Sequence, residues 1–545
     1  MELRRASIGA LLITVIFSAS FLAGGQVKFR ADDPLKDDPD RNPVPLPQER
    51  ELSQIYDLVE NTWIMRPQKE EEVPEAQNID TLGEVPDSSW YTNRMSKRVM
   101  SIEELVRGPD QLSESDEYRP WTLISVKTQG VTPGFTVRNA RGDVFFVKFD
   151  PPGNPQMSTS GEVIATKFFH AFGYNVPENY LTFLQYKDLE ISPDARLTDE
   201  NGIVRPVGQK DLEKIFERIY QGPDGKTPTV ASLRISGIPL GPFRYYGTRP
   251  DDPNDIFPHE HRRELRGLRL FAAWLNHDDS RSINSLDMYQ GEPGAGYVKH
   301  YLIDFGSCLG SGSIKVQSRR AGNEYMIEFM PIFKAGISLG IWDRAWRHVK
   351  YPDYPSIGRF EGDFFQPERW RPEYPNPAFE RMQPVDAFWA VRIILRFTDE
   401  MVRAIVKTGE LSNPEAEDYL ARTLIKRRDK IIRHYLPQTS PLDEFGVVSD
   451  SDTPSLSFVN LMLSSGMAES DLYEYEWFQY DNSTGTLTNL AETSATDQTR
   501  IPIPPGNREY LMVRIHSNRI SEGDKHKIDV YLRNQANPQI VGIER

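Results

Sequence analysis

The chain has 545 residues, several times the length of a typical domain of about 150, so more than one folded unit is expected. Its 64 lysines and arginines against 79 aspartates and glutamates leave a net charge of −15. This charge argues against a general nucleic-acid-binding protein, because neutralising phosphates needs surplus cations. The single cysteine, Cys308, excludes an intramolecular disulfide and a thiolate-based metal site.

The first 25 residues resemble an export signal. Arg4 and Arg5 precede an uncharged stretch, residues 6–25, which has an apolar middle and a small-residue end. The stretch is also just long enough to stay in place as one membrane anchor. We therefore expect a protein exported to the bacterial periplasm or cell envelope, a location that suits a chain without disulfides. This segment is the one possible membrane tether.

Two segments come before the first predicted strands. Residues 26–50 are acidic and rich in proline, with too few apolar residues to pack, which predicts a disordered linker. Residues 51–118 contain short helical stretches and loops, and we interpret them as an N-terminal extension.

Strand patterns then begin. Residues 121–127, 135–139 and 144–149 are rich in β-branched and aromatic residues, and turn-forming residues separate them. This pattern predicts an antiparallel three-stranded meander. A helix is predicted over residues 160–172, with Gly173 as its cap.

The second half of the chain is mainly helical. A helix over residues 261–275 leads into a polar loop, and a β-hairpin follows that ends near Asp304. Two helices are then predicted, one over residues 384–408 and one over residues 414–436, the latter with Asn413 as its cap.

The C-terminal part has a different pattern. Residues 437–454 are polar and rich in residues that break helices and strands, which predicts a second linker. Residues 455–545 alternate between apolar and polar residues in the manner of strands, which predicts a β-sandwich-like domain.

The first candidate site residues are a lysine and a glutamate. Lys148 lies in a predicted strand with apolar neighbours on both faces, so it needs an anionic partner unless it extends to water. Glu162, fourteen residues later on the predicted helix, is the obvious partner. However, the run from Thr159 to Glu162 also fits a capping box, in which the glutamate bonds the backbone amide of the cap residue.

The other candidates surround the polar loop and the end of the hairpin. Asp279 and Asn284 are five residues apart, so their side chains can face one centre across a tight loop. The carboxylate can orient or deprotonate a hydroxyl, and the amide oxygen suits magnesium, although an Asx-rich turn would use the same residues. Asp304, followed by Phe305 and Gly306, ends a predicted strand and is well placed to hold a metal, although an ordinary strand-to-turn junction has the same pattern.

Taken in order, these residues resemble the signature set of protein kinases. The loop after the first strand holds two glycines, Gly130 and Gly134, rather than a full glycine-rich pattern, and an Ala-Pro-Glu motif is missing after Gly306. The run from Gly161 to Tyr180 and the stretch WLNHDD look more like the atypical branch. That branch includes HipA-type toxin kinases, CotH-type spore-coat kinases and type II phosphatidylinositol 4-kinases.

The resemblance implies an α+β, two-lobed kinase-like fold over residues 119–436. A small antiparallel β lobe would span about residues 119–185, and a larger helical lobe about residues 186–436. It implies magnesium and ATP as ligands, with Asp279 as catalytic base and Asp278 as its rival. The remaining implied roles are phosphate binding for Lys148, pairing with Lys148 for Glu162, nucleotide contact for Gly130 and Gly134, and magnesium binding for Asn284 and Asp304.

We therefore expect an exported, Mg-ATP-dependent phosphotransferase acting on a protein or small-molecule hydroxyl. The alternative is a catalytically inactive kinase-like scaffold of the cell envelope. Asp287 falls on the strand after the loop and is not expected to act, and Cys308 fits a small buried residue better than a nucleophile. Arg319 and Arg320 fit either an anion-binding pair or a solvated basic pair.

Overall fold

The structure is a computed structural model that describes most of the chain. The predicted signal or anchor segment and Gly130 lie outside the described residues. No helix in the described part combines the length and apolarity needed to cross a membrane. The described residues are 27–35, 38–65, 73–112, 119–127, 134–198, 203–328, 343–449, 454–518, 526–535 and 537–545.

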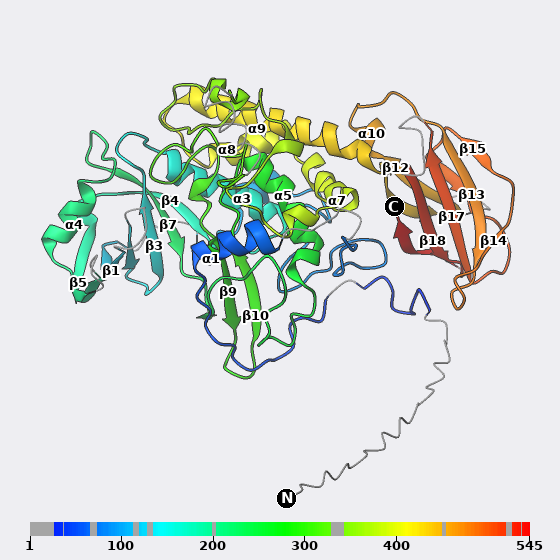
Figure 1. The fold of residues 1–545 in the computed structure, drawn as a ribbon, viewed down its shortest axis with the longest axis horizontal. Coiled ribbons are helices and arrows are strands. Elements are labelled where there is room, and N and C mark those ends of the chain that lie inside the picture. Colours follow the sequence, from blue (N-terminus) through cyan, green and yellow to red (C-terminus); the bar gives the residue numbers. More distant parts are fainter. Residues whose placement is uncertain are drawn as a thin grey trace, which may run out of the picture.

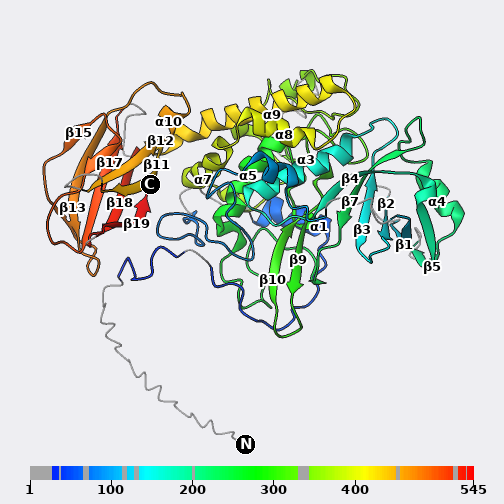
Figure 2. The ribbon, with the colours of Figure 1, turned by 180° about the vertical axis from the view of Figure 1, so that it is seen from behind.

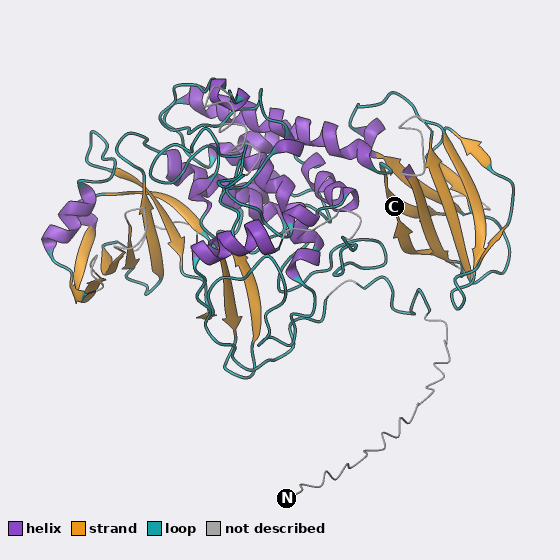
Figure 3. Ribbon diagram, in the orientation of Figure 1, coloured by secondary structure: helices purple, strands orange, loops and turns teal. Residues whose placement is uncertain are grey.

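The molecule is a mixed α+β structure with strand-rich parts at its two ends and helices gathered between them (Figures 1 and 3). One end contains a seven-stranded sheet in the order β4-β7-β3-β2-β1-β5-β6. Its strands are β1 (Trp121–Lys127), β2 (Gly134–Arg138), β3 (Val144–Phe149), β4 (Asn179–Leu184), β5 (Leu189–Thr198), β6 (Val204–Pro206) and β7 (Thr227–Leu233).

The predicted meander is confirmed, because β1, β2 and β3 pair antiparallel in chain order. The sheet continues beyond the predicted small lobe: β5 pairs parallel to β1, and β7 pairs antiparallel to β3. One face of β3 buries Phe145, Val147 and Phe149 against helix α4 (Gln209–Phe216). Since side chains alternate along a strand, Lys148 lies on the opposite face.

Helix α3 (Met157–Phe172) begins three residues before its predicted start. The buried carboxylate of Asp150 accepts hydrogen bonds from the backbone amides of Ser158 (2.8 Å) and Thr159 (3.0 Å) and from the Thr159 hydroxyl (2.7 Å). Asp150 thereby satisfies the orphan amides at this helix end. The capping-box alternative for Glu162 is therefore wrong, and the Glu162 side chain is available for another partner. The helix ends at Gly173, whose φ of +118° favours glycine.

The predicted helix over residues 384–408 is wrong as a single element. The structure divides it into α7 (Pro384–Leu395) and α8 (Asp399–Lys407), because the Thr398 hydroxyl accepts a hydrogen bond from the Met401 amide (3.2 Å) and starts a new helix. The helical core joins α3 to α5 (Arg263–Leu275), with the rings of Phe172 and Phe271 stacked at 4.1 Å. Helix α9 (Pro414–Tyr435) leads toward the C-terminal strands (Figure 2).

A small sheet lies beside the helices. The predicted hairpin is present as β9 (Ser285–Gln290) and β10 (Tyr297–Leu302), which pair antiparallel, with β8 (Ile238–Pro239) along the other edge of β9. The short helices α1 (Gln54–Val59) and α2 (Ile102–Arg107) belong to the N-terminal extension.

The C-terminal strands form two sheets that share one core, to which Leu456 and Phe458 of one sheet and Trp477 and Val513 of the other contribute. Strand β11 lies inside the predicted second linker. The first sheet contains β11 (Leu442–Val448), β12 (Ser455–Asn460) and β16 (Arg500–Pro502), with α10 (Leu461–Ser464) after β12. The second contains β13 (Tyr473–Tyr480), β14 (Leu487–Asn489), β15 (Ser494–Thr496), β17 (Tyr510–Ser517), β18 (Lys527–Arg533) and β19 (Gln539–Glu544).

The described part of the predicted disordered linker packs against the body. Phe29 is buried among aromatic residues of the C-terminal sheet, and Val44 is buried beside Tyr289 of β9. The carboxylate of Asp40 accepts hydrogen bonds from the backbone and hydroxyl of Ser89. Two widely spaced apolar residues and a buried aspartate therefore attach this proline-rich segment.

Candidate functional site

A cavity of about 860 Å³ lies between the seven-stranded sheet and the loops that flank the small sheet. This volume is in the range of sites for small molecules and cofactors. Its wall includes Lys148, Glu162, Asp279, Asn284 and Asp304, so the structure brings these sequence-predicted residues to one place.

Lys148 lies between two carboxylates. Its ammonium contacts Glu162 at 2.8 and 3.1 Å and the Oδ1 atom of Asp304 at 2.9 Å. The Glu162 side chain is 1% exposed and the Asp304 side chain is 48% exposed, so the cluster is closed on the helix side and open on the cavity side. Burial by itself lowers the pKa of Lys148, but Asp304 and Glu162 together raise it above its usual value, so the lysine stays charged.

Gly134 lies opposite Lys148 in the β2–β3 pairing and also lines the cavity. A Cβ atom at this position would lie 2.5 Å from the carbonyl oxygen of Val147. Only glycine therefore allows β2 to approach this closely and form the cavity wall beside the lysine.

The polar loop begins where α5 ends, at Asn276, whose φ is +52°. The Asn284 amide donates a hydrogen bond to the carbonyl oxygen of Asp279 at 2.8 Å, which closes the loop between the two predicted residues. The backbone carbonyl of Asn284 accepts a hydrogen bond from the backbone amide of Ile303 at 3.0 Å. This bond holds the chain just before Asp304 next to the loop. The turn-type hydrogen bond from the Asn284 side chain is therefore present, and both residues line the cavity.

The carboxylate of Asp279 is held by Arg281 at 2.6 Å, and Arg281 also bonds the carboxylate of Glu373. Burial alone lowers the pKa of Arg281, but Asp279 and Glu373 raise it, so the arginine is charged. Burial raises the pKa of Glu373. Both residues are missing from the sequence prediction. Arg281 lies within the loop motif, where its charge was a usable signal, whereas Glu373 lies far along the chain and offers none.

Asp278, the rival of Asp279, has different surroundings. Its Oδ1 atom accepts a hydrogen bond of 2.6 Å from the amide of Gln317, a buried residue that sequence reasoning also missed. Burial first, and then the neighbouring Asp279, raise the pKa of Asp278 well above its usual value. Asp278 therefore binds a proton more readily than an ordinary aspartate, while Asp279 has a cationic partner.

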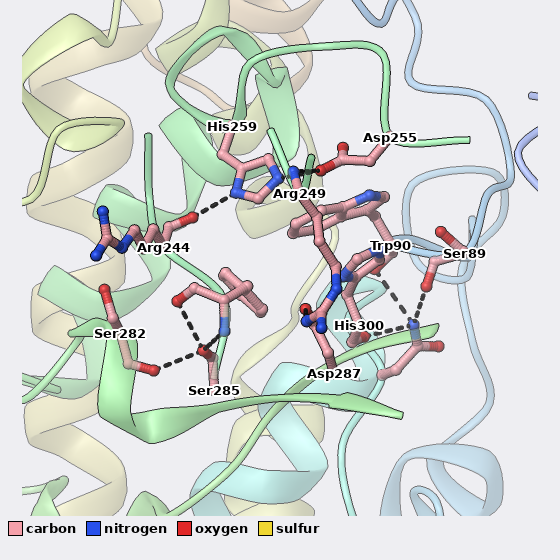
Figure 4. A network of polar contacts seen from close by, with 12 residues as sticks. Ser89, Trp90, Arg244, Arg249, Asp255, His259, Ser282, Ser285, Asp287 and His300 are labelled. Atoms are coloured by element: carbon pink, nitrogen blue, oxygen red, sulfur yellow. Dashed lines mark hydrogen bonds and ion pairs between the residues drawn. The ribbon is translucent and has the colours of Figure 1, made fainter. Parts of the chain in front are cut away.

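A second polar network supports the loop from behind (Figure 4). Asp287 of β9 contacts His300 of β10 at 2.7 Å and Arg249 at 2.9 Å, and the indole of Trp90 stacks on His300 with 3.5 Å between ring centroids. The Ser285 hydroxyl donates to the carbonyl of Ser282 within the loop at 2.6 Å. Asp287 is thus buried in a structural network and, as expected from its position on the strand, does not line the cavity.

The structure also places the three remaining candidates. Cys308 is fully buried and burial raises the pKa of its thiol, so its surroundings do not favour a nucleophile. Arg319 donates to the carbonyl of Val349 at 2.7 Å and is not part of the cavity wall, whereas Arg320 lines the cavity. The two adjacent arginines therefore do not act as a pair.

Metal binding requires oxygen donors that can reach a common point. Among the described residues, no group of three or more histidines, cysteines or acidic residues is arranged to hold a metal ion. Asn284 and Asp304 supply two oxygen-bearing side chains on adjoining segments of the cavity wall. This donor set fits magnesium, which commonly takes one or two carboxylates and completes its shell with water and phosphate oxygens.

No protein-family model and no curated protein matches this chain. Among solved structures, the proinflammatory kinase CtkA of Helicobacter pylori is similar at 13% sequence identity, over 56% of this chain and 94% of that chain, with a TM-score of 0.30. At this TM-score the likeness is weak, and it assigns no function to the chain.

Proposed function

We propose that the protein is a Mg-ATP-dependent kinase-like phosphotransferase that transfers the γ-phosphate to a hydroxyl. The observation that carries the proposal is the position of Lys148, held between the buried Glu162 and the cavity-facing Asp304. A charged lysine at this place can receive an anionic ligand that displaces Asp304, while Glu162 keeps the ammonium in position.

The cavity wall fits a nucleotide in its composition as well as its size. Apolar side chains line part of it, including Phe146 of β3, Ile235 after β7, and Leu286 and Met288 of β9. Lys148 and the polar loop line the rest. Such a division suits a ligand with an apolar ring system and a charged end.

Each chain residue then has a separate task in phosphoryl transfer. Lys148 neutralises phosphate charge, and Glu162 keeps its ammonium in position. Asn284 and Asp304 would hold magnesium, which supplies further neutralisation of charge when bound. Asp279 orients the acceptor hydroxyl and takes its proton, while Arg281 holds the Asp279 carboxylate in place. Asp278 is less suited to this task, because its Oδ1 atom already accepts a hydrogen bond from Gln317 and burial disfavours its charged form.

Nucleotide binding is the first test. Thermal unfolding with magnesium and ATP at about 100 times the dissociation constant should stabilise the protein by about 2.7 kcal/mol. Lys148→Met should remove most of this shift, because the lysine supplies the positive charge. Asp418→Ala, which changes an exposed ion pair that does not line the cavity, is the matched control. An absence of any shift with the unmodified protein would overturn the proposal.

The second candidate function is an inactive kinase-like scaffold. It is favoured by one observation: Asp279 is engaged by Arg281 and Asp304 by Lys148, so both candidate active carboxylates already have cationic partners. The two candidates differ in turnover. Transfer of labelled phosphate from ATP that Asp304→Ala abolishes supports the enzyme, whereas nucleotide binding without transfer to a broad set of acceptors supports the scaffold.

The proposed location is the bacterial periplasm or cell envelope, and it rests on the sequence of residues 1–25. Cell fractionation with and without these residues tests it. Recovery of the full chain from the cytoplasm in its native host would contradict export.

A further inference from the structure

The cavity wall contains two cationic side chains to which the proposed function assigns no role. Lys315 and Arg320 lie in its wall on the segment that follows Asp304. This segment faces the polar loop rather than the strand that carries Lys148, since Gln317, between the two cations, bonds the side chain of Asp278.

The segment is held firmly enough to present a site. The Gln317 side chain is buried and donates to the Asp278 carboxyl oxygen (2.6 Å) and to the carbonyl of Ser307 (3.1 Å). The carbonyl of Lys315 accepts from the Gly312 amide at 2.8 Å, and that of Arg320 accepts from the Asn323 amide at 2.9 Å. Both cations therefore extend from a braced backbone.

Arg320 has unused hydrogen-bonding capacity at this place. Its Nη1 atom is buried and has no hydrogen-bond partner within the protein. Across the described ranges, no ion pair joins Arg320 or Lys315 to a carboxylate. The Arg281 Nε atom in the same cavity wall also lacks a hydrogen-bond acceptor, but it lies 2.6 Å from the carboxylate of Asp279. The Arg320 nitrogen has no such ion pair, so it is a donor that an anionic ligand in the cavity can use.

The neighbouring arginine provides a contrast. Arg319 donates to the backbone carbonyls of Arg347 (3.2 Å) and Val349 (2.7 Å) and lies outside the cavity wall. The same residue type, one position earlier, is thus satisfied by the protein itself. The unused donor is a property of the Arg320 position and not of a basic segment in general.

We propose that Arg320 and Lys315 form an anion-binding subsite for the phosphate acceptor, so that the acceptor is a hydroxyl compound that also carries a phosphate-type anionic group. The inference rests on the proposed function, since it names the acceptor class of the same site. The subsite lies on the side of Asp278 and Glu373, the residues that flank Asp279, and the guanidinium group suits a phosphate because it offers several donors in one plane.

Inorganic phosphate is the probe for this subsite. Its binding is measured by calorimetric titration, first to the protein alone and then with magnesium and a saturating non-hydrolysable ATP analogue. We expect phosphate to bind in both conditions, and Arg320→Gln to weaken binding about ten-fold or more, because a hydrogen bond to a charged group is lost. Arg319→Gln, the matched control, should leave the affinity unchanged, and both variants should keep the melting temperature of the unmodified protein.

Three results would overturn the subsite. The first is no binding of phosphate at millimolar concentration, and the second is equal affinity in the Arg320→Gln variant. The third is loss of phosphate binding when the ATP analogue is present, because Arg320 would then serve the phosphates of the nucleotide. Failure of the proposed function is a separate result, since it appears as the absence of a thermal shift with Mg-ATP, whatever the phosphate titration gives.

Discussion

Two charge clusters in this molecule use similar residues and differ in what surrounds them. Arg249, Asp287 and His300 are each at most 2% exposed, and protein groups enclose the cluster (Figure 4). In the second cluster, Lys148 contacts the buried Glu162, but the third member, Asp304, is 48% exposed and borders the cavity. The first cluster is closed and the second is open.

The difference indicates what each cluster can do. A closed cluster has all its charges neutralised by the protein, so it holds chain segments together and has nothing to offer a ligand. An open cluster keeps one carboxylate at the edge of a cavity, where a ligand can compete for it. The same chemistry therefore serves structure in one place and supports binding in the other.

The largest change in the free energy of unfolding is expected from breaking the closed cluster. Arg249→Leu leaves the buried Asp287 without its arginine and should lower the free energy of unfolding by about 3–5 kcal/mol. Arg403→Leu removes an ion pair to Asp418 that is half-exposed at both ends, and should cost less than about 1 kcal/mol. Urea denaturation of both variants checks the contrast. Equal destabilisation would contradict the assignment of a structural role to the closed cluster.

The next effect tests the open cluster. Asp304→Asn should leave the free energy of unfolding nearly unchanged, because Lys148 keeps Glu162 as a partner. It should lower ATP-dependent phosphate transfer about 100-fold or more, because a magnesium ligand and an oriented charge are lost. Transfer assays and urea denaturation on the same preparation separate the two quantities. Unfolding without a specific loss of transfer would mean that this cluster, too, is structural.

A smaller effect is expected at Arg281, which we treat as a positioning residue for Asp279. Arg281→Gln should lower kcat about ten-fold, with KM for ATP changed much less, since the bond to a charged group is lost on the acceptor side. Arg281→Lys should restore part of kcat by returning the charge. A parallel rise in KM for ATP, without rescue by lysine, would point to a general loss of structure.

The smallest effect concerns the pH dependence at Asp278. Burial and Asp279 raise the pKa of Asp278 in the folded protein above the unfolded value of 3.8. The contribution of Asp278 to folding stability is therefore complete below pH 3.8 and is lost as the pH rises through the folded-state pKa. Asp278→Asn keeps the acceptor for Gln317 and cannot ionise. The melting temperature of the variant should therefore rise relative to the unmodified protein as the pH increases above 3.8. A constant difference would show that Asp278 does not titrate in the folded protein.

Local patterns predicted many of the elements that carry the site. The strands β1 and β3 have their predicted limits, and α5 and the β9–β10 hairpin lie where periodicity and turn residues placed them. The predicted helix limits were wrong where a side-chain hydrogen bond, which periodicity does not reveal, sets the start of a helix. Thr398 divides an apolar run into two helices, and Asp150 caps α3 from outside the predicted motif.

The pairing of Lys148 with Glu162 was foreseen as one of two possibilities. Strand and helix positions indicated a partner for the lysine, but the capping-box alternative used the same glutamate. The choice depended on where α3 begins, which Asp150 decides. Glu373 and Gln317 could not have been found, because nothing in their local sequence marks them as neighbours of residues 278–281.

The sequence alone determined the element types, the charges and the order of the candidate residues, since these follow from local periodicity and side-chain chemistry. Tertiary structure alone decided which charges are enclosed and which face the cavity. It separated Asp279 from Asp278 and Arg320 from Arg319, pairs that are equivalent in sequence. The physical reason is that burial and hydrogen-bond satisfaction depend on contacts between distant segments, and these contacts set whether a charged group is occupied or available.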